Sequence, residues 1–144
     1  MLTSETTSAA ALASRLRGAV TRLNRRLRAS SLGPTSPGQA SALAMIDRLG
    51  TPSVGELAAA EQVRPPSMTR IVDALQSMGL VTRTVDPLDR RCLRVALTGA
   101  GRRELAAIRR RKTEFLEARL AALGAGSRER VAAALDVLEQ LAED

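Results

Sequence analysis

At 144 residues, the chain has the length of a single domain with one sizeable core, or of a small domain whose helical extensions complete their core on a second copy. Its 22 basic and 15 acidic residues give a net charge of +7, which favours a polyanionic partner, nucleic acid foremost. The sequence has no His and a single Cys, which excludes a metal site rich in His or Cys, a His-based catalytic triad and a disulfide within the chain. We expect no catalytic residues, metal or cofactor.

The sequence lacks two features of membrane and secreted proteins. No stretch approaches the ~18 apolar residues of a membrane-spanning helix, and the N-terminal stretch lacks the charged-then-apolar order of a signal peptide. We therefore expect a cytoplasmic protein with no membrane partner. A membrane-surface role for the Arg-rich residues 15–28 is weak, because their apolar face offers Leu without Trp or Phe.

The first half of the chain predicts three helices. Residues 9–28 place apolar side chains at helical spacing, with arginines off that stripe. Ser36 and Gln39 form a capping box at the start of a second helix, roughly 37–49. Ser53 and Glu56 repeat the capping box and predict a short helix of about two turns.

The second half predicts a helix, a hairpin and two more helices. A helix should open at residues 65–66, since first-turn prolines sacrifice no intrahelical hydrogen bond, and should end at Gly79. The β-prone stretches 80–85 and 91–97 flank turn residues 86–89 and predict a hairpin. Thr98 fits the N-cap of a long helix, which Gly124-Ala125-Gly126 should terminate, and Ser127 should cap the last helix.

Two short helices followed by a two-stranded hairpin match a winged helix-turn-helix, whose second helix can enter the major groove of DNA by its N-terminal end. Arg70 is the best candidate for a base contact at that end. At the hairpin tip, the guanidinium groups of Arg90 and Arg91 suit the negative potential of a narrow minor groove, and Asp89 can hold the fork of Arg91 in one direction. The candidate DNA-contacting residues are Ser53, Arg64, Pro65, Pro66, Ser67, Thr69, Arg70, Arg83, Asp89, Arg90 and Arg91.

Each of these arginines, taken singly, can also be an ordinary solvated side chain. Charge is nevertheless segregated along the chain: residues 64–94 sum to +3 and residues 95–112 to +5, whereas residues 113–144 sum to −4. Arginines at the start of the second helix and at the hairpin tip lie within the positively charged part of the chain, and this agreement favours DNA binding.

Residues 56–101 resemble the winged-helix core of the MarR family of bacterial transcription regulators. The most specific part is Asp89-Arg90-Arg91 followed by Leu97-Thr98-Gly99-Ala100-Gly101. It is similar to a family signature of Asp, any residue, Arg, then Leu-Thr and a Gly three residues after the Thr. The sequence departs from the family at Glu61 and Gln62, where an apolar residue and Gly are common.

The resemblance implies a mainly α fold with a small β-hairpin. A winged helix-turn-helix region (about 36–98) would be flanked by N- and C-terminal dimerisation helices (about 9–30 and 99–144) in a single domain, 1–144. By position, Arg91 would be the minor-groove arginine, Asp89 its partner, and residues 65–70 the start of the recognition helix. The apolar stripes of the end helices exceed what the central unit can cover, which independently argues for a partner surface.

The function that the resemblance implies is a homodimeric, sequence-specific transcriptional regulator of double-stranded DNA. We expect a repressor of a palindromic operator that is released by a small-molecule effector, whose contacts the sequence does not indicate. The alternative is a winged-helix protein-protein interaction module without DNA binding. An enzyme is disfavoured because no nucleophile and base converge.

Three further features each have two interpretations. Cys92 is either a small strand residue, which we favour, or an oxidisable thiol beside Arg91. Phe115 fits the core better than a ligand-stacking role. The basic run 109–112 either flanks DNA or, as we favour, is a solvated helix face with Glu114 and Glu117 within reach.

Overall fold

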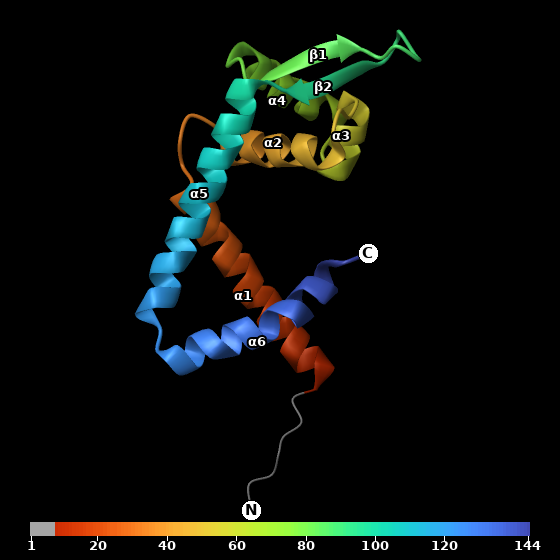
Figure 1. Ribbon diagram of the computed structural model, residues 1–144. Coiled ribbons are helices and arrows are strands. Elements are labelled where there is room, and N and C mark those ends of the chain that lie inside the picture. Colours follow the sequence, from red (N-terminus) through yellow and green to blue (C-terminus); the bar gives the residue numbers. More distant parts are fainter. Residues whose placement is uncertain (1–7) are drawn as a thin grey trace, which may run out of the picture.

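The order of elements is four helices, a hairpin and two helices, as predicted. The computed structural model describes residues 8–144, so the signal-peptide expectation falls partly on residues outside the described part of the chain. The elements are α1 (Ala9–Ser30), α2 (Pro37–Leu49), α3 (Val54–Ala60), α4 (Pro65–Ser77), β1 (Val81–Val85), β2 (Leu93–Leu97), α5 (Gly99–Ala122) and α6 (Ala125–Ala142). A head made of α2 to β2 lies at one end, and α1, α5 and α6 extend away from it (Figure 1).

Side-chain caps fix where the first two helices of the head, α2 and α3, begin. The Ser36 hydroxyl accepts a hydrogen bond from Gln39 N at 3.2 Å, and Gln39 Oε1 accepts one from Ser36 N at 2.9 Å. Ser53 and Glu56 form the same reciprocal pair at the start of α3, at 3.1 and 3.4 Å. Both predicted capping boxes are confirmed, and they satisfy N–H groups that a helix start otherwise leaves free.

The head contains the apolar core. On α4, Met68, Val72 and Leu75 lie on one buried face, which leaves the face with Arg70 exposed. Leu105 and Ile108 bring the first half of α5 into the same cluster. The largest fully buried apolar side chains are Leu43, Ile46, Leu57, Met68, Leu75, Val72, Val81, Val95 and Pro52. The core therefore supports α4 and the hairpin together.

The hairpin is antiparallel, with Val81 opposite Leu97 and Val85 opposite Leu93. Both strands are shorter than predicted, and Cys92 lies in the connection 86–92, which we call the wing loop, rather than on a strand. The reason is local hydrogen bonding: Asp86 N donates to Cys92 O, and Cys92 N donates to Asp89 O, both at 2.9 Å. These bonds close the loop on itself before the strand ladder begins.

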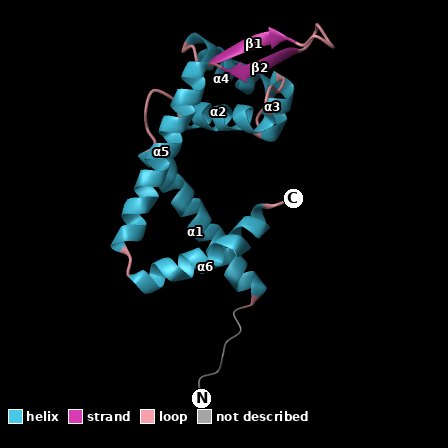
Figure 2. Cartoon of the chain, viewed as in Figure 1, coloured by secondary structure: helices cyan, strands magenta, loops and turns pink. Residues whose placement is uncertain are grey.

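The junction between α5 and α6 also differs from the prediction. Helix α5 ends at Ala122, and Gly124 occupies the N-cap position of α6, so Ser127 lies in the first turn of α6 and does not cap it. Leu123 and Gly124 are both extended, and this short link turns the chain between the two helices (Figure 2). Glycine can stand at the end or at the start of a helix, so the Gly-Ala-Gly run does not specify at which residue α5 ends and α6 begins.

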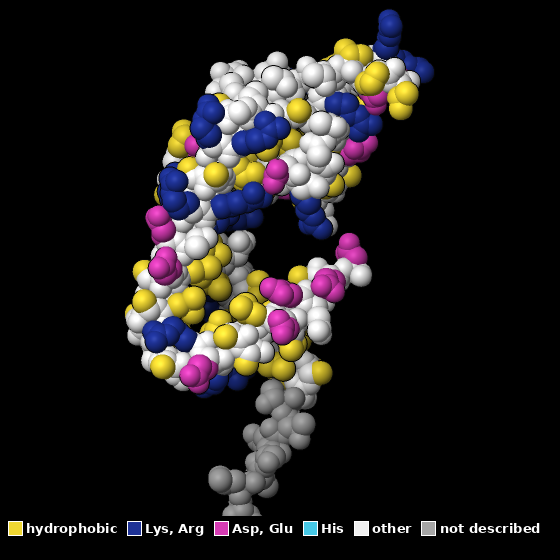
Figure 3. All heavy atoms as spheres, viewed as in Figure 1, with side chains coloured by type: hydrophobic (Ala, Val, Ile, Leu, Met, Phe, Trp, Pro, Cys, Tyr) yellow, Lys and Arg dark blue, Asp and Glu magenta, His cyan; other side chains and the backbone are white. Residues whose placement is uncertain are grey.

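The end helices are covered little within one chain. Neither α1 nor α6 contains a buried residue. Apolar side chains gather along the space between them (Figure 3). The exposed apolar residues of these helices include Leu12, Val20, Leu23, Val131, Leu135, Val137, Leu138 and Leu141. Among residues 8–144, no helix is long and apolar enough to cross a membrane.

Candidate nucleic-acid interface

The turn between α3 and α4 keeps a tight geometry despite its unusual residues. Gln62 has a φ of 56°, in the left-handed region that favours glycine. Glu61 accepts a hydrogen bond from the Ser41 hydroxyl at 2.7 Å, which ties the turn to α2. Glu61 and Gln62 therefore replace the residues that are common in the family, but the backbone at position 62 keeps the left-handed conformation that favours glycine.

The start of α4 presents the predicted helix residues together. Arg64 occupies the N-cap position and makes no side-chain capping bond, and two prolines follow in the first turn. The Thr69 hydroxyl donates to Pro65 O at 3.0 Å. The exposed polar residues here are Arg64, Ser67, Thr69 and Arg70. Within residues 8–144, no protein group pairs with the guanidinium of Arg64 or Arg70, and the helix N-terminus adds partial positive charge.

The wing loop presents Arg91 to solvent. Its side chain is 97% exposed, and its Nε lies 3.7 Å from Asp89 Oδ1. The same carboxylate oxygen accepts a hydrogen bond from Arg91 N at 3.1 Å. Asp89 therefore constrains both the backbone and the side chain of Arg91. Arg90, beside it, is exposed as well.

Ser53 lies close to the wing loop in space. A shallow surface hollow is lined by Ser53 and the start of α3 on one side and by Asp89, Arg91 and Cys92 on the other. The Ser53 hydroxyl caps α3, and its backbone forms an isolated β-bridge with Arg94. The structure thus brings three predicted residues together here, and their contact with DNA stays a prediction.

Arg83 is placed differently from the other candidates. Its side chain is 18% exposed and forms an ion pair of 2.5 Å with Asp73, together with a hydrogen bond to Gln76. Both partners belong to α4, so Arg83 braces β1 against that helix. A contact between Arg83 and DNA stays a prediction, and the role that the structure shows is the link between β1 and α4.

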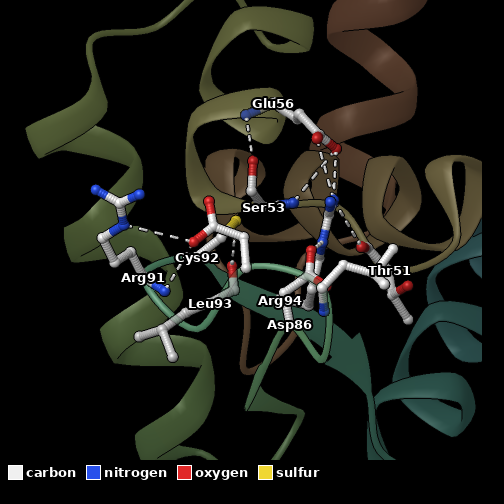
Figure 4. A network of polar contacts seen from close by, with 10 residues as sticks. Thr51, Ser53, Glu56, Asp86, Arg91, Cys92, Leu93 and Arg94 are labelled. Carbon is white, nitrogen blue, oxygen red and sulfur yellow. Dashed lines mark hydrogen bonds and ion pairs between the residues drawn. The ribbon is translucent and has the colours of Figure 1, made fainter.

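Arg94 is a residue of the wing that the sequence analysis did not single out. Its Nε lies 3.1 Å from Asp86 Oδ2, and its Nη1 lies 3.0 and 3.1 Å from the two carboxylate oxygens of Glu56. Nη1 also donates to Thr51 O at 3.4 Å (Figure 4). No local pattern links these residues, because Glu56 is 38 positions from Arg94 and meets it only in the folded head.

The hydrogen bonds in this network shift two pKa values. The Leu88 N–H, which donates to Asp86 Oδ1 at 2.8 Å, lowers the pKa of Asp86 below its ordinary value of 3.8, and Arg94 lowers it further against the opposing effect of burial. Hydrogen bonds to Asp86 and then to Glu56 raise the pKa of Arg94. Both groups are therefore charged at neutral pH.

The Leu-Thr-x-x-Gly part of the signature forms the joint between the hairpin and α5. The Thr98 hydroxyl donates to Gly79 O at 2.7 Å and accepts from Gly101 N at 3.0 Å, and Thr98 N donates to Leu80 O at 3.0 Å. A Cβ on Gly101 would lie 2.0 Å from Leu80 O. The signature therefore fixes how α5 leaves the head, and the predicted Thr98 cap is confirmed.

The basic run on α5 is only partly the solvated face that was expected. Arg110 Nε lies 3.9 Å from Glu114 Oε1, as the helical spacing predicts. Arg109, however, pairs with Asp47 of α2 at 3.1 Å. Arg111 is 28% exposed and pairs with Glu104 at 3.4 Å. The pairing of Arg109 is a contact with another helix, which helical spacing does not reveal, whereas Glu104 lies two turns before Arg111 on α5 itself.

Phe115 lies outside the buried cluster of the head. It is half-buried, and the guanidinium of Arg119 lies 5.0 Å from the centre of its ring. The expected core position is therefore wrong for the single chain, because this part of α5 extends beyond the head. Across residues 8–144, no group of three or more Asp, Glu or Cys side chains is placed to hold a metal ion.

Relatives share this sequence and fold. The family model described as "MarR family" matches residues 35–93. An HTH-type transcriptional regulator of Mycobacterium tuberculosis is 40% identical over 138 residues, covering 95% of this chain and 96% of that protein. An uncharacterized HTH-type transcriptional regulator of Mycobacterium leprae is 39% identical over 138 residues, with the same coverage of both chains.

Solved structures are similar over nearly the whole chain. A Pseudomonas aeruginosa protein described as a transcriptional regulator is 38% identical, with a TM-score of 0.80 over 92% of this chain and 94% of that one. A MarR family protein from Bacillus stearothermophilus is 26% identical, with a TM-score of 0.74 over 91% and 92%. A mutant of Staphylococcus aureus MepR, bound to an oligodeoxyribonucleotide, has the same fold at 17% identity, with a TM-score of 0.68 over 92% and 98%. The chain belongs to the MarR family of HTH-type transcriptional regulators.

Proposed function

We propose that this protein is a homodimeric repressor that binds a palindromic operator and is released by a small anionic ligand. The observation that carries DNA binding is that two elements supported by one core present exposed basic side chains. Arg64 and Arg70 stand at the exposed start of α4, and Arg91 stands at the exposed tip of the wing. A polyanion is the partner that this arrangement fits.

The two elements read different parts of the duplex. The start of α4 enters the major groove, where Arg70 contacts base edges while Arg64, Ser67 and Thr69 hold phosphates. Arg91 enters the minor groove beside it. Asp89 already restricts the orientation of the guanidinium, so less conformational freedom is lost on docking. MepR, which has this fold, is bound to an oligodeoxyribonucleotide in its own structure.

The end helices form the interface between the two protomers of the proposed dimer. Their apolar side chains are exposed in the single chain, and α1 carries six Arg and no acidic residue. Acidic side chains gather toward the C-terminal end of α6 (Figure 3). Pairing α6 of one protomer with α1 of the other would cover the apolar faces and match the charges. A two-fold dimer of this kind sets its recognition helices about 34 Å apart, one turn of DNA.

The effector site is a cavity of about 250 Å³ where α1, α2 and α5 meet. Arg28, Arg109 and Lys112 line it and favour a negatively charged ligand. Thr35 also lines it, and its hydroxyl is buried without a hydrogen-bond partner in the described structure. A ligand held there would touch the dimer helix α1 and the head together, and so could change the spacing of the two heads.

Selection of bound sequences from a random duplex pool tests the proposed function. We expect a palindrome whose half-sites are centred about one helical turn apart. Recovery of unrelated sequences would contradict sequence-specific binding. A stable complex with another protein, together with no affinity for DNA at low salt, would favour the interaction module instead.

A further inference from the structure

The guanidinium of Arg94 links the side chains of the wing loop to helix α3 of the head. Among the described residues, the side chains of residues 86–92 make two polar contacts outside the loop: Asp86 pairs with Arg94, and Cys92 Sγ lies 4.0 Å from the backbone oxygen of the adjacent Leu93. Of the two, only the pair with Arg94 leads on to another element of the head. Arg94 continues this link to Glu56 at the start of α3. The chain of contacts therefore runs from the loop, through Arg94, to a helix of the core (Figure 4).

Both ends of this link are themselves fixed. Asp86 is 8% exposed, and its second oxygen accepts the hydrogen bond from Leu88 N. Glu56 accepts a hydrogen bond from Ser53 N at 3.4 Å within the capping box, which places its carboxylate at the start of α3. The backbone adds a parallel contact, since Val95 N donates to Pro52 O at 2.8 Å. Arg94 thus joins two carboxylates, each of which also accepts a hydrogen bond from a backbone N–H.

Arg94 is turned toward the protein, in contrast to Arg91. Its side chain is 30% exposed, and the guanidinium points at Glu56 while Arg91 extends away from it (Figure 4). A planar fork with several donors can reach both carboxylates and the Thr51 carbonyl at once, which the single ammonium of a Lys cannot do with the same geometry.

We propose that Arg94 is a positioning residue for DNA binding: it makes no DNA contact itself, and it holds the wing loop in the orientation that delivers Arg91 to the minor groove. This inference rests on the proposed function. Without Arg94, the loop would sample more orientations, and Arg91 would lose more conformational freedom on docking.

A double-mutant cycle in the intact protein tests the proposal, with a duplex carrying the selected operator as the probe. Arg94→Met should weaken binding roughly two- to tenfold, the cost of ordering one long side chain on docking. It should leave the salt slope unchanged, because no phosphate contact is lost. In the Arg91→Ala background, Arg94→Met should change the affinity less than twofold. Arg94→Lys, which keeps the charge, should retain part of the affinity.

Three results would overturn the proposal. The first is an unchanged affinity of Arg94→Met. The second is the same fold-loss in both backgrounds, which would show that Arg94 does not act through Arg91. The third is a salt slope reduced by about one unit per contact, which would make Arg94 a phosphate ligand.

Limited digestion with trypsin tests the anchor without DNA. Cuts after Arg90 and Arg91, read by mass spectrometry, should appear faster in Arg94→Met than in the wild type at equal global stability. An equal rate would overturn the anchoring role even if DNA binding is confirmed. Faster cuts with no duplex binding by the wild type would support the anchor and refute the proposed function, so the two failures are distinguishable.

Discussion

Gly101 lies so close to Leu80 that a Cβ at position 101 would stand 2.0 Å from the Leu80 carbonyl oxygen. This oxygen also accepts the hydrogen bond from Thr98 N, so it cannot move aside freely. Gly101→Ala should therefore push α5 away from the hairpin and destabilise the fold by about 1–3 kcal/mol, the usual cost of overpacking. Denaturant titration measures the change in the free energy of unfolding.

Gly99→Ala is the matched control in the same helix. A Cβ at Gly99 would meet only the flexible end of Arg103, at 3.4 Å. We expect its stability to stay within about 0.5 kcal/mol of the wild type, as for most surface substitutions. Equal destabilisation by the two substitutions would mean that the close approach to Leu80 is not what requires glycine.

Gln62 holds a backbone conformation that costs a residue with a side chain about 1–2 kcal/mol. Gln62→Gly should remove that strain and, after the extra entropy that glycine loses on folding, stabilise the protein by about 0.5–1 kcal/mol. Gln62→Ala, which keeps the strain, should gain nothing. Thermal unfolding compares the three proteins, and a lower melting temperature for Gln62→Gly would contradict the assignment of strain to this turn.

Asp86 makes the stability of the wing sensitive to acid. Its pKa is lowered in the folded protein, first by the Leu88 N–H and also by Arg94, so its ionised form favours folding. This contribution is fully present above its ordinary pKa of 3.8 and is lost as the pH falls through the lower pKa of the folded state. Unfolding of the wild type and Asp86→Asn should differ at pH 7 and converge as the pH falls below about 4. A difference that stays constant with pH would contradict this.

The apolar face of α6 should be required for association of two chains. Leu138→Asp would place a carboxylate among apolar side chains in each half of the dimer, at a cost of several kcal/mol per buried charge. Sedimentation should then show monomers where the wild type is a dimer. Leu88→Asp, on the exposed wing loop, should stay dimeric, and a monomeric wild type would contradict the proposed assembly.

Local signals in the sequence accounted for most of the elements. Capping pairs such as Ser36 with Gln39 act within one turn of a helix, so their spacing can be read directly. The apolar period placed Met68, Val72 and Leu75 on the buried face of α4 and thereby left Arg70 exposed. The start of α4 and the Asp89–Arg91 pair could both be predicted in this way.

What the sequence could not reveal depends on contacts between distant segments. Glu56, Asp86 and Arg94 show no shared periodicity and meet only when the hairpin packs on α3. Arg83 is a predicted DNA contact, yet its side chain pairs with Asp73 because β1 lies against α4. The same holds for Arg109, whose partner Asp47 comes from α2.

The most direct test of DNA binding through the wing is the salt dependence of affinity for the selected palindromic duplex, measured for the wild type and Arg91→Ala. We expect the affinity of the wild type to decrease steeply with salt. Arg91→Ala should bind more weakly, with a slope that is flatter by about one unit per lost phosphate contact. Salt-independent binding by the wild type, or an unchanged affinity and slope for Arg91→Ala, would contradict DNA binding through the wing.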